Sequence, residues 1–193
     1  MKQVKMGIQG GKGSFSEEAA QIFSHNHGID NPEIVYLISS KAVLAGIEAE
    51  DIGFGVFAME NAQGGVVIES VEAMAEYRCR IVEMFHIPVS QNLLSMEGVN
   101  MGDVIEIHSH QQALRQCKDY LAEHFWTRPL IEADDTAEAA RRLSQGKIPE
   151  TAAVIGSKYC AELYGLNILE KDIHDLKHNL TLFLGVEKIE ESE

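Results

Sequence analysis

Short apolar runs alternate with segments of helical periodicity along most of this 193-residue chain, and this alternation limits the possible folds more than any other feature. Val4, Met6 and Ile8 alternate with polar or small residues, which predicts a strand, and apolar residues recur at helical spacing over 15–23. Further strands are predicted near 34–38, 52–58, 104–107, 130–131, 152–155, 166–169 and 182–186. Further helices are predicted after a cap at Ser39 or Ser40, over about four turns near 113–121, over 135–143 with Asp135 near the start, and over 157–164 with Gly165 at the end. Strands that alternate with helices of about ten residues form βαβ units and mostly parallel sheets.

The helical rhythm is interrupted between Arg80 and Leu94, where two strand-like runs follow one another closely. We interpret this interruption as the crossing into a second lobe, so the predicted fold class is α/β with two small α/β lobes. Residues 1–84 and 166–187 are predicted to form a discontinuous first lobe, 85–165 the second lobe, and 188–193 an acidic tail. Ligands of such folds bind at the carboxyl ends of strands and between lobes, so we expect an inter-lobe cleft.

Composition and charge exclude several classes of function. The net charge of −14 argues against nucleic-acid binding, which needs clustered Lys and Arg, and a small anion would need a local positive field. No run approaches about 18 apolar residues, and none follows the N-terminal residues as a signal peptide would require, so we expect neither a membrane span nor export. The three cysteines are widely spaced, which favours buried free thiols in a reducing cytoplasm.

A glycine-rich turn, Gly10-Gly11-Lys12-Gly13-Ser14, separates the first predicted strand from the first predicted helix. Ser14 and Glu17 fit a capping box at the start of that helix. Backbone N–H groups and the helix dipole favour an anion at such a turn, although a tight turn without a ligand has the same sequence. The residues do not fit a dinucleotide fingerprint, because Ser16 stands where the third glycine belongs, nor a P-loop. The predicted ligand contacts of this turn are Gly10, Gly11, Gly13 and Ser14.

Polar residues also follow other predicted strands. Glu60 and Asn61 end one strand, and Ser109 ends another, with Gln116 on the helix that comes next. Such carboxylate, amide and hydroxyl groups can bind the hydroxyl and keto groups of a small ligand. His108 and His110 form an H-x-H pair, but no third ligand lies at a suitable spacing, so we predict no metal site.

Four segments together resemble the catalytic domain of the prephenate dehydratase family. The glycine-rich turn with Phe15-Ser16 resembles the family opening G-P-E-G-T-F-S and a related opening in plant arogenate dehydratases. Ala58-Met59-Glu60-Asn61 resembles P-I-E-N, and the segment 109–117 resembles S-H-P-Q-A-L-x-Q-C. The segment 179–183 resembles N-x-T-R-F, with Leu182 in place of the arginine. The resemblance covers about residues 4–186 and implies two lobes like those of type II periplasmic binding proteins.

The resemblance implies an enzyme that converts prephenate to phenylpyruvate by coupled decarboxylation and dehydration. The catalytic residues implied are Thr181, Glu60, Asn61, Ser109 and Gln116, and the further substrate contacts are Glu83, Asn179 and Phe183. Glu83 reaches the site only if a one-residue bulge shifts its strand, because an ungapped count places Met84 there. No metal or organic cofactor is implied, and the expected partners are a cyclic dicarboxylate substrate and a second copy in a homodimer. Family members usually carry an ACT domain after this one, and we expect no feedback control by that route here.

Leu182 keeps other interpretations open, because it cannot supply the charge of the family arginine. A bidentate contact between arginine and a carboxylate is among the stronger polar contacts in proteins. The alternatives are an arogenate dehydratase, a prephenate decarboxylase that retains the hydroxyl, and a non-catalytic module that binds a small anion.

Overall fold

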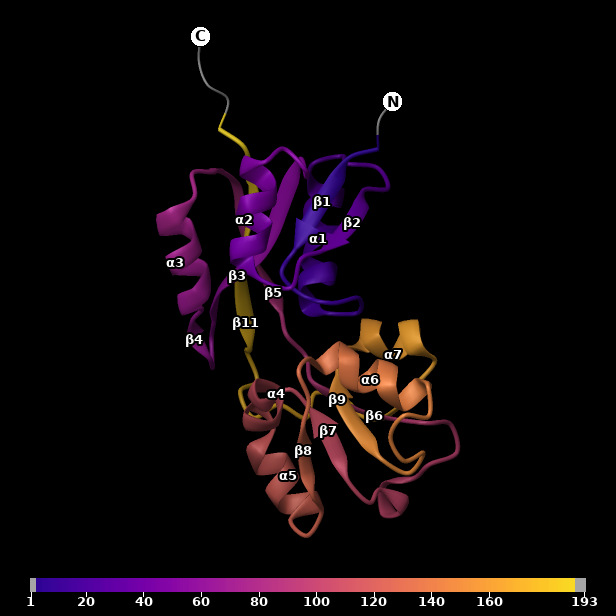
Figure 1. Ribbon diagram of the computed structural model, residues 1–193. Helices are drawn as coiled ribbons and strands as arrows, with labels where there is room; N and C mark the ends of the chain where they lie inside the picture. Colours follow the sequence, from indigo (N-terminus) through magenta and orange to yellow (C-terminus); the bar gives the residue numbers. More distant parts are fainter. Residues whose placement is uncertain (1–2, 190–193) are drawn as a thin grey trace. The chain divides into compact units, whose positions relative to one another are not determined.

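The computed structural model describes residues 3–189, and within them the chain forms two compact units, each built on its own sheet (Figure 1). The first unit comprises the described residues up to Pro88 and those from Leu180 onward, and the second comprises Val89–Asn179. The predicted α/β class is confirmed.

The first unit is built on a six-stranded sheet with the order β2-β1-β3-β11-β5 and with β4 paired to β3. Its strands are β1 (Lys5–Ile8), β2 (Glu33–Tyr36), β3 (Phe54–Asn61), β4 (Gly65–Val66), β5 (Arg80–Pro88) and β11 (Leu180–Glu187). Its helices are α1 (Phe15–Asn26), α2 (Ser40–Glu48) and α3 (Ile68–Glu76). β1 is parallel to both β2 and β3, whereas β11 is antiparallel to β3 and β5.

Two apolar clusters cover the two faces of this sheet. Phe23 of α1 packs with Phe85 and Phe183 on one face, which we term the α1 face. Val43 of α2 and Ala73 of α3 pack with Leu184 on the other, the α2/α3 face. Phe183 and Leu184 are neighbours in β11 and enter different clusters, as the two-residue period of a strand requires.

The second unit is built on a five-stranded sheet with the order β10-β6-β9-β7-β8. Its strands are β6 (Asn92–Ser95), β7 (Ile107–Ser109), β8 (Leu130–Glu132), β9 (Ala153–Gly156) and β10 (Asn167–Glu170). Its helices are α4 (Gln111–Gln116), α5 (Lys118–Phe125), α6 (Thr136–Ser144) and α7 (Lys158–Tyr164), with a 3₁₀ turn at Met101–Asp103. β7 is parallel to β8 and β9, and its carboxyl end leads into α4.

Most of the residues that the sequence indicated as helix caps do end or begin helices in the structure. The Ser39 hydroxyl accepts a hydrogen bond from the Ala42 N–H at 3.1 Å, and Asp135 accepts one from the Ala137 N–H at 3.3 Å, so both residues cap helices as predicted. Gly165 ends α7 with a left-handed conformation at φ 64°. The single helix expected near 113–121 is instead two helices, because Cys117 leaves helical geometry at φ −113°.

The boundaries between the units differ from those expected. Residues 85–88 were expected in the second lobe and 166–179 in the first, whereas the structure places each segment in the other unit. The strand at Asn167–Glu170 pairs with β6, and Leu166 and Ile168 pack against the core of the second unit. An apolar strand does not reveal from its own residues which sheet it joins.

No helix among residues 3–189 is long and apolar enough to cross a membrane. Of the acidic tail expected at 188–193, only Lys188 and Ile189 lie within the described residues, and Lys188 forms an ion pair with Glu50.

Candidate active site

The carboxyl edge of the first sheet gathers several of the predicted site residues. β1 and β3 are parallel and end at this edge, where β1 leads into the Gly10–Ser14 turn and β3 ends at Asn61. Antiparallel β11 begins at the same edge, and Thr181 is opposite Asn61. The Gln9 side chain accepts a hydrogen bond from the Ala58 N–H at 3.1 Å, which fixes the start of the turn against β3.

Asn61 and Thr181 form a hydrogen-bonded pair at this edge. The Asn61 Nδ2 donates to the Thr181 Oγ1 at 2.8 Å. The Asn61 Oδ1 accepts from the backbone N–H groups of Gln63 at 3.1 Å and Gly64 at 2.8 Å, so the amide group is oriented with its nitrogen towards Thr181. Because the Thr181 oxygen already accepts from Asn61, its own proton is left to be donated to another group. Thr181 is buried, with 6% of its surface exposed.

A β-bulge in β3 brings these two residues to the same face. Phe183 is opposite Ala58 and Leu182 is opposite Glu60, so Met59 is an extra residue in β3. In a regular strand Ala58 and Asn61, three residues apart, would lie on opposite faces, and the extra residue removes this difference. Asn61 therefore lies on the α1 face of the sheet with Thr181.

The same register separates Glu60 and Leu182 from the Asn61–Thr181 pair. Leu182 is opposite Glu60 and follows Thr181 directly, so both Leu182 and Glu60 lie on the α2/α3 face. Glu60 is exposed, and Met59 beside it packs against the core of that face. The structure thus does not bring Glu60 to the Thr181 hydroxyl.

The carboxylate of Glu17 occupies part of the glycine-rich turn. The Gly13 N–H donates to Glu17 Oε2 at 2.6 Å, and the Ser14 N–H donates to the Gly11 carbonyl at 3.2 Å. Gly10 and Gly13 have φ values of 141° and 92°, which favour glycine. The expected capping box is wrong, because the Ser14 side chain makes no capping hydrogen bond and Glu17 binds the Gly13 N–H instead.

Two further predicted substrate contacts lie elsewhere in the first unit. Glu83 lies at the C-terminal end of α1, where it accepts a hydrogen bond from Asn26 at 3.2 Å and its Oε2 is 2.9 Å from His27 Nε2. A bulge in β5 does precede Glu83, but Glu83 is opposite Gly185, four positions along β11 from Thr181. That spacing corresponds to about 13 Å along a strand. Phe183 is a core residue of the α1 face.

Ser109 and Gln116 lie in the second unit, and both are buried. The Ser109 hydroxyl donates to the Ile155 carbonyl at 3.0 Å. Gln116 Oε1 accepts from Gln91 Nε2 at 3.0 Å, a contact that the motifs of the sequence did not indicate. Asn179 is also buried and donates to the Val89 carbonyl at 3.3 Å.

His108, His110 and Cys117 of this unit each interact with neighbouring groups of the protein. His110 accepts from the Gln112 N–H at 3.2 Å and caps α4, and His108 pairs with Glu106 at 2.8 Å. Within the described part of the chain, no group of three His, Cys, Asp or Glu residues could hold a metal ion. Burial raises the pKa of the Cys117 thiol, and the charge of Asp175 raises it further, so Cys117 is not an activated nucleophile.

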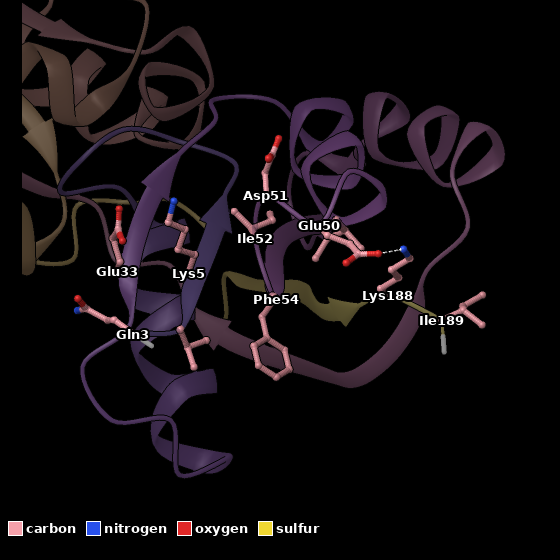
Figure 2. Close-up of a pocket in the computed structure, with 12 residues that line it drawn as sticks. Gln3, Lys5, Glu33, Glu50, Asp51, Ile52, Phe54, Lys188 and Ile189 are labelled. Carbon is pink, nitrogen blue, oxygen red and sulfur yellow. Dashed lines mark hydrogen bonds and ion pairs between the residues drawn. The ribbon is translucent and has the colours of Figure 1, made fainter. Parts of the chain in front are cut away.

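A large cavity of the first unit lies at the opposite edge of its sheet. The cavity has a volume of about 1240 Å³ and lies where β1 and β3 begin. Figure 2 shows the residues that line it. Its lining residues include Lys5, Glu33 and Phe54, together with Glu50 and Lys188, which form an ion pair. The cavity is therefore remote from the motif residues, and none of the residues that line it belongs to those motifs. The candidate active site is accordingly placed at the motif residues.

Comparisons with known proteins agree with the motif residues. A family model described as prephenate dehydratase matches residues 6–191. "Arogenate dehydratase/prephenate dehydratase 2, chloroplastic" of Arabidopsis thaliana is 32% identical over 182 residues, which are 94% of this chain and 46% of that protein. The prephenate dehydratase of Methanocaldococcus jannaschii is 30% identical over 182 residues, which are 92% of this chain and 62% of that protein.

Solved structures also resemble the chain. The prephenate dehydratase of Arthrobacter aurescens, solved in complex with L-Phe, has a TM-score of 0.87 and 25% identity and covers 97% of this chain and 61% of its own. This chain therefore spans roughly half to two thirds of the length of the proteins it matches. Because the family model matches residues 6–191, which is nearly the whole chain, the chain belongs to the prephenate dehydratase family.

Proposed function

We propose that the chain is a dehydratase that converts prephenate to phenylpyruvate. The observation that carries the proposal is the Asn61–Thr181 pair, a buried hydroxyl whose oxygen is fixed by an oriented amide at the carboxyl edge of a sheet. Membership of the family and the names of the relatives support the reaction class.

The reaction requires little chemistry from the protein, because aromatisation drives it. The bond between the ring and its carboxylate breaks and releases carbon dioxide, and that electron pair enters the ring as the bond to the ring hydroxyl breaks. The departing hydroxyl takes up a proton from the solvent and leaves as water. We assign Thr181 as the hydrogen-bond donor to the departing oxygen, with Asn61 as the residue that directs its proton.

Other residues are proposed on weaker grounds. Ser109 and Gln116 are proposed as residues that position the substrate, because the 109–117 segment resembles the family motif over nine positions. Ser14 is proposed as a substrate contact in the glycine-rich turn. Glu60 and Glu83 are not retained as contacts of the reacting atoms, since their positions in the sheet separate them from Thr181. Phe183 is not retained either, because its side chain is buried in the core of the α1 face.

Arogenate is the second candidate substrate, because the plant relative is named for both activities. Arogenate carries an amino group where prephenate carries a keto group, and it yields phenylalanine with the same loss of carbon dioxide and water. Purified protein should be supplied with each compound, with phenylpyruvate and phenylalanine as the measured products. The compound with the higher kcat/KM is the preferred substrate.

The assay with variants tests the proposal itself. Thr181→Ala should lower kcat by about 10²- to 10³-fold, because the departing oxygen loses its donor. Thr181→Ser should stay within about tenfold of wild type, since it keeps the hydroxyl. Thr127→Ala, at an exposed position, is the matched control. Loss of substrate without phenylpyruvate would indicate a decarboxylase, and saturable binding without turnover would indicate a binding module; either result contradicts the proposal.

The predicted homodimer and cytoplasmic location remain predictions. Light scattering of the purified chain would measure its oligomeric state directly.

A further inference from the structure

The carboxylate of Glu17 occupies the inner side of the glycine-rich turn. Its Oε2 accepts from the Gly13 N–H at 2.6 Å, and its Oε1 accepts from the Tyr36 hydroxyl at 2.8 Å. Only 5% of the Glu17 surface is exposed. The short distance to Gly13 is typical of a charge-assisted hydrogen bond. A buried negative charge is thus already bound at the positive end of α1, a 12-residue helix.

The Ser14 hydroxyl lies in the same turn and has no hydrogen-bond partner among the described residues. Ser14 is 7% exposed. Its Oγ points towards Gly10, since a Cβ added at Gly10 would lie 2.6 Å from it. A buried hydroxyl without a partner is costly, so such a group in a native protein needs an explanation. A ligand oxygen or nitrogen bound in the turn would supply the missing partner.

The two observations together define the kind of group that fits. An incoming carboxylate or phosphate would find the Gly13 N–H taken and would be repelled by Glu17 from a short distance. Lys12 cannot offset this repulsion fully, because it is exposed and its field is screened by water and salt, whereas Glu17 is buried. The hydroxyl of Ser14 can both donate and accept, so it can bind an uncharged hydroxyl or carbonyl oxygen.

We propose that the Gly10–Ser14 turn binds an uncharged oxygen of the ligand through the Ser14 hydroxyl, and that Glu17 excludes anions from it. The turn would then bind the hydroxyl or keto group of the substrate and leave its carboxylates to other residues. This reverses the expectation from the sequence that the turn favours an anion. The identity of the substrate rests on the proposed function, but the exclusion of anions does not.

A phosphate titration followed by amide NMR tests the exclusion without any turnover. Inorganic phosphate is added to wild type and to Glu17→Gln, and the shifts of the Gly13 and Ser14 amides are measured. Glu17→Gln removes the charge at nearly constant shape, so it should bind phosphate at these amides at least about tenfold more tightly than wild type does.

Two matched variants complete the titration. Glu72→Gln, at an exposed position of α3, changes the net charge equally and should behave as wild type. Tyr36→Phe removes one donor to Glu17 but keeps its charge, so the turn should remain closed to phosphate. Equal phosphate affinity in wild type and Glu17→Gln would overturn the proposal, and so would binding to neither.

The role of Ser14 is tested with prephenate. Ser14→Ala should raise KM about tenfold and leave kcat within about threefold, because the ligand loses a ground-state contact. Ser14→Thr restores the hydroxyl and should restore KM. An unchanged KM in Ser14→Ala would overturn this part of the proposal. If wild type does not turn over prephenate, the proposed function fails, and the phosphate titration still decides whether Glu17 excludes anions.

Discussion

Leu182 and Thr181 are neighbours in the chain, yet the alternation of β11 places them on opposite faces of the sheet. The departure from the family signature at Leu182 therefore affects the surroundings of Glu60, its cross-strand neighbour, and not the Thr181 hydroxyl. The motifs named Asn61 and Thr181 as candidate site residues, but their hydrogen bond to one another is visible only in the structure. Their separation from Glu60 could not, because the bulge at Met59 has no signature in the sequence.

Leu182→Arg tests this separation at the level of one residue. Arginine at this position would lie opposite Glu60 and form a cross-strand ion pair, with a gain in stability of about 0.2–1 kcal/mol. The turnover of prephenate should stay within about threefold of wild type, because the guanidinium lies on the other face from Thr181. The double variant Leu182→Arg/Glu60→Gln should lose the gain in stability. A rate increase of about 30-fold or more would show that the position reaches the substrate.

The packing of α1 against β11 determines where the glycine-rich turn can lie. Gly185 of β11 lies directly beneath Phe23 of α1, and an added Cβ would be 2.2 Å from the Phe23 ring. The sequence predicted the strands and helices of this unit well, because their apolar periods are regular. The continuous helix expected around Cys117 of the second unit is interrupted where the Asp175 N–H donates to the Gln116 carbonyl. The capping role expected for Ser14 is absent because Glu17 binds the Gly13 N–H and the Tyr36 hydroxyl instead.

Gly185→Ala tests this packing at the level of the elements. The added methyl group must displace the Phe23 ring, so we expect a loss of about 1–3 kcal/mol in the free energy of unfolding. Gly53→Ala is the control within the same unit, because the nearest atom to its Cβ would be 3.7 Å away. Urea titrations of the two variants measure the difference. A Gly185→Ala variant as stable as Gly53→Ala would contradict the account of the α1 packing.

At the scale of the whole molecule, the second unit holds two tyrosines, Tyr120 and Tyr164, whose surroundings disfavour the ionised form. Burial raises the pKa of both Tyr120 and Tyr164 to about 12.

The existence of two units could be predicted from the interrupted helical rhythm, but their boundaries could not. The strand at Asn167–Glu170 looks the same in the sequence whichever sheet it joins, and only its pairing with β6 decides.

The raised pKa values predict how stability depends on pH. Both hydroxyls stay protonated in the folded chain at a pH at which they ionise in the unfolded chain. Their contribution to stability is therefore complete below about pH 10 and is lost as the pH rises towards about 12. Tyr164→Phe removes one titrating group, so its urea-unfolding free energy should fall less between pH 9 and pH 11 than that of wild type.

Tyr120→Phe sharpens the same test. Its hydroxyl is buried without a hydrogen-bond partner among the described residues, so its removal should leave the stability at neutral pH equal or higher by up to about 1 kcal/mol. The alkaline loss should again be smaller than in wild type. An alkaline profile that is unchanged in both variants would show that these hydroxyls do not cause the loss.

The central claim is that Asn61 and Thr181 act together as one group on the departing hydroxyl. A double-mutant cycle on kcat for phenylpyruvate formation tests it most directly, with Asn61→Ala, Thr181→Ala and the double variant. We predict that each single variant loses about 10²- to 10³-fold and that the double variant loses little more than the more severe single one. Losses that multiply in the double variant, or a Thr181→Ala variant with wild-type kcat, would contradict the account.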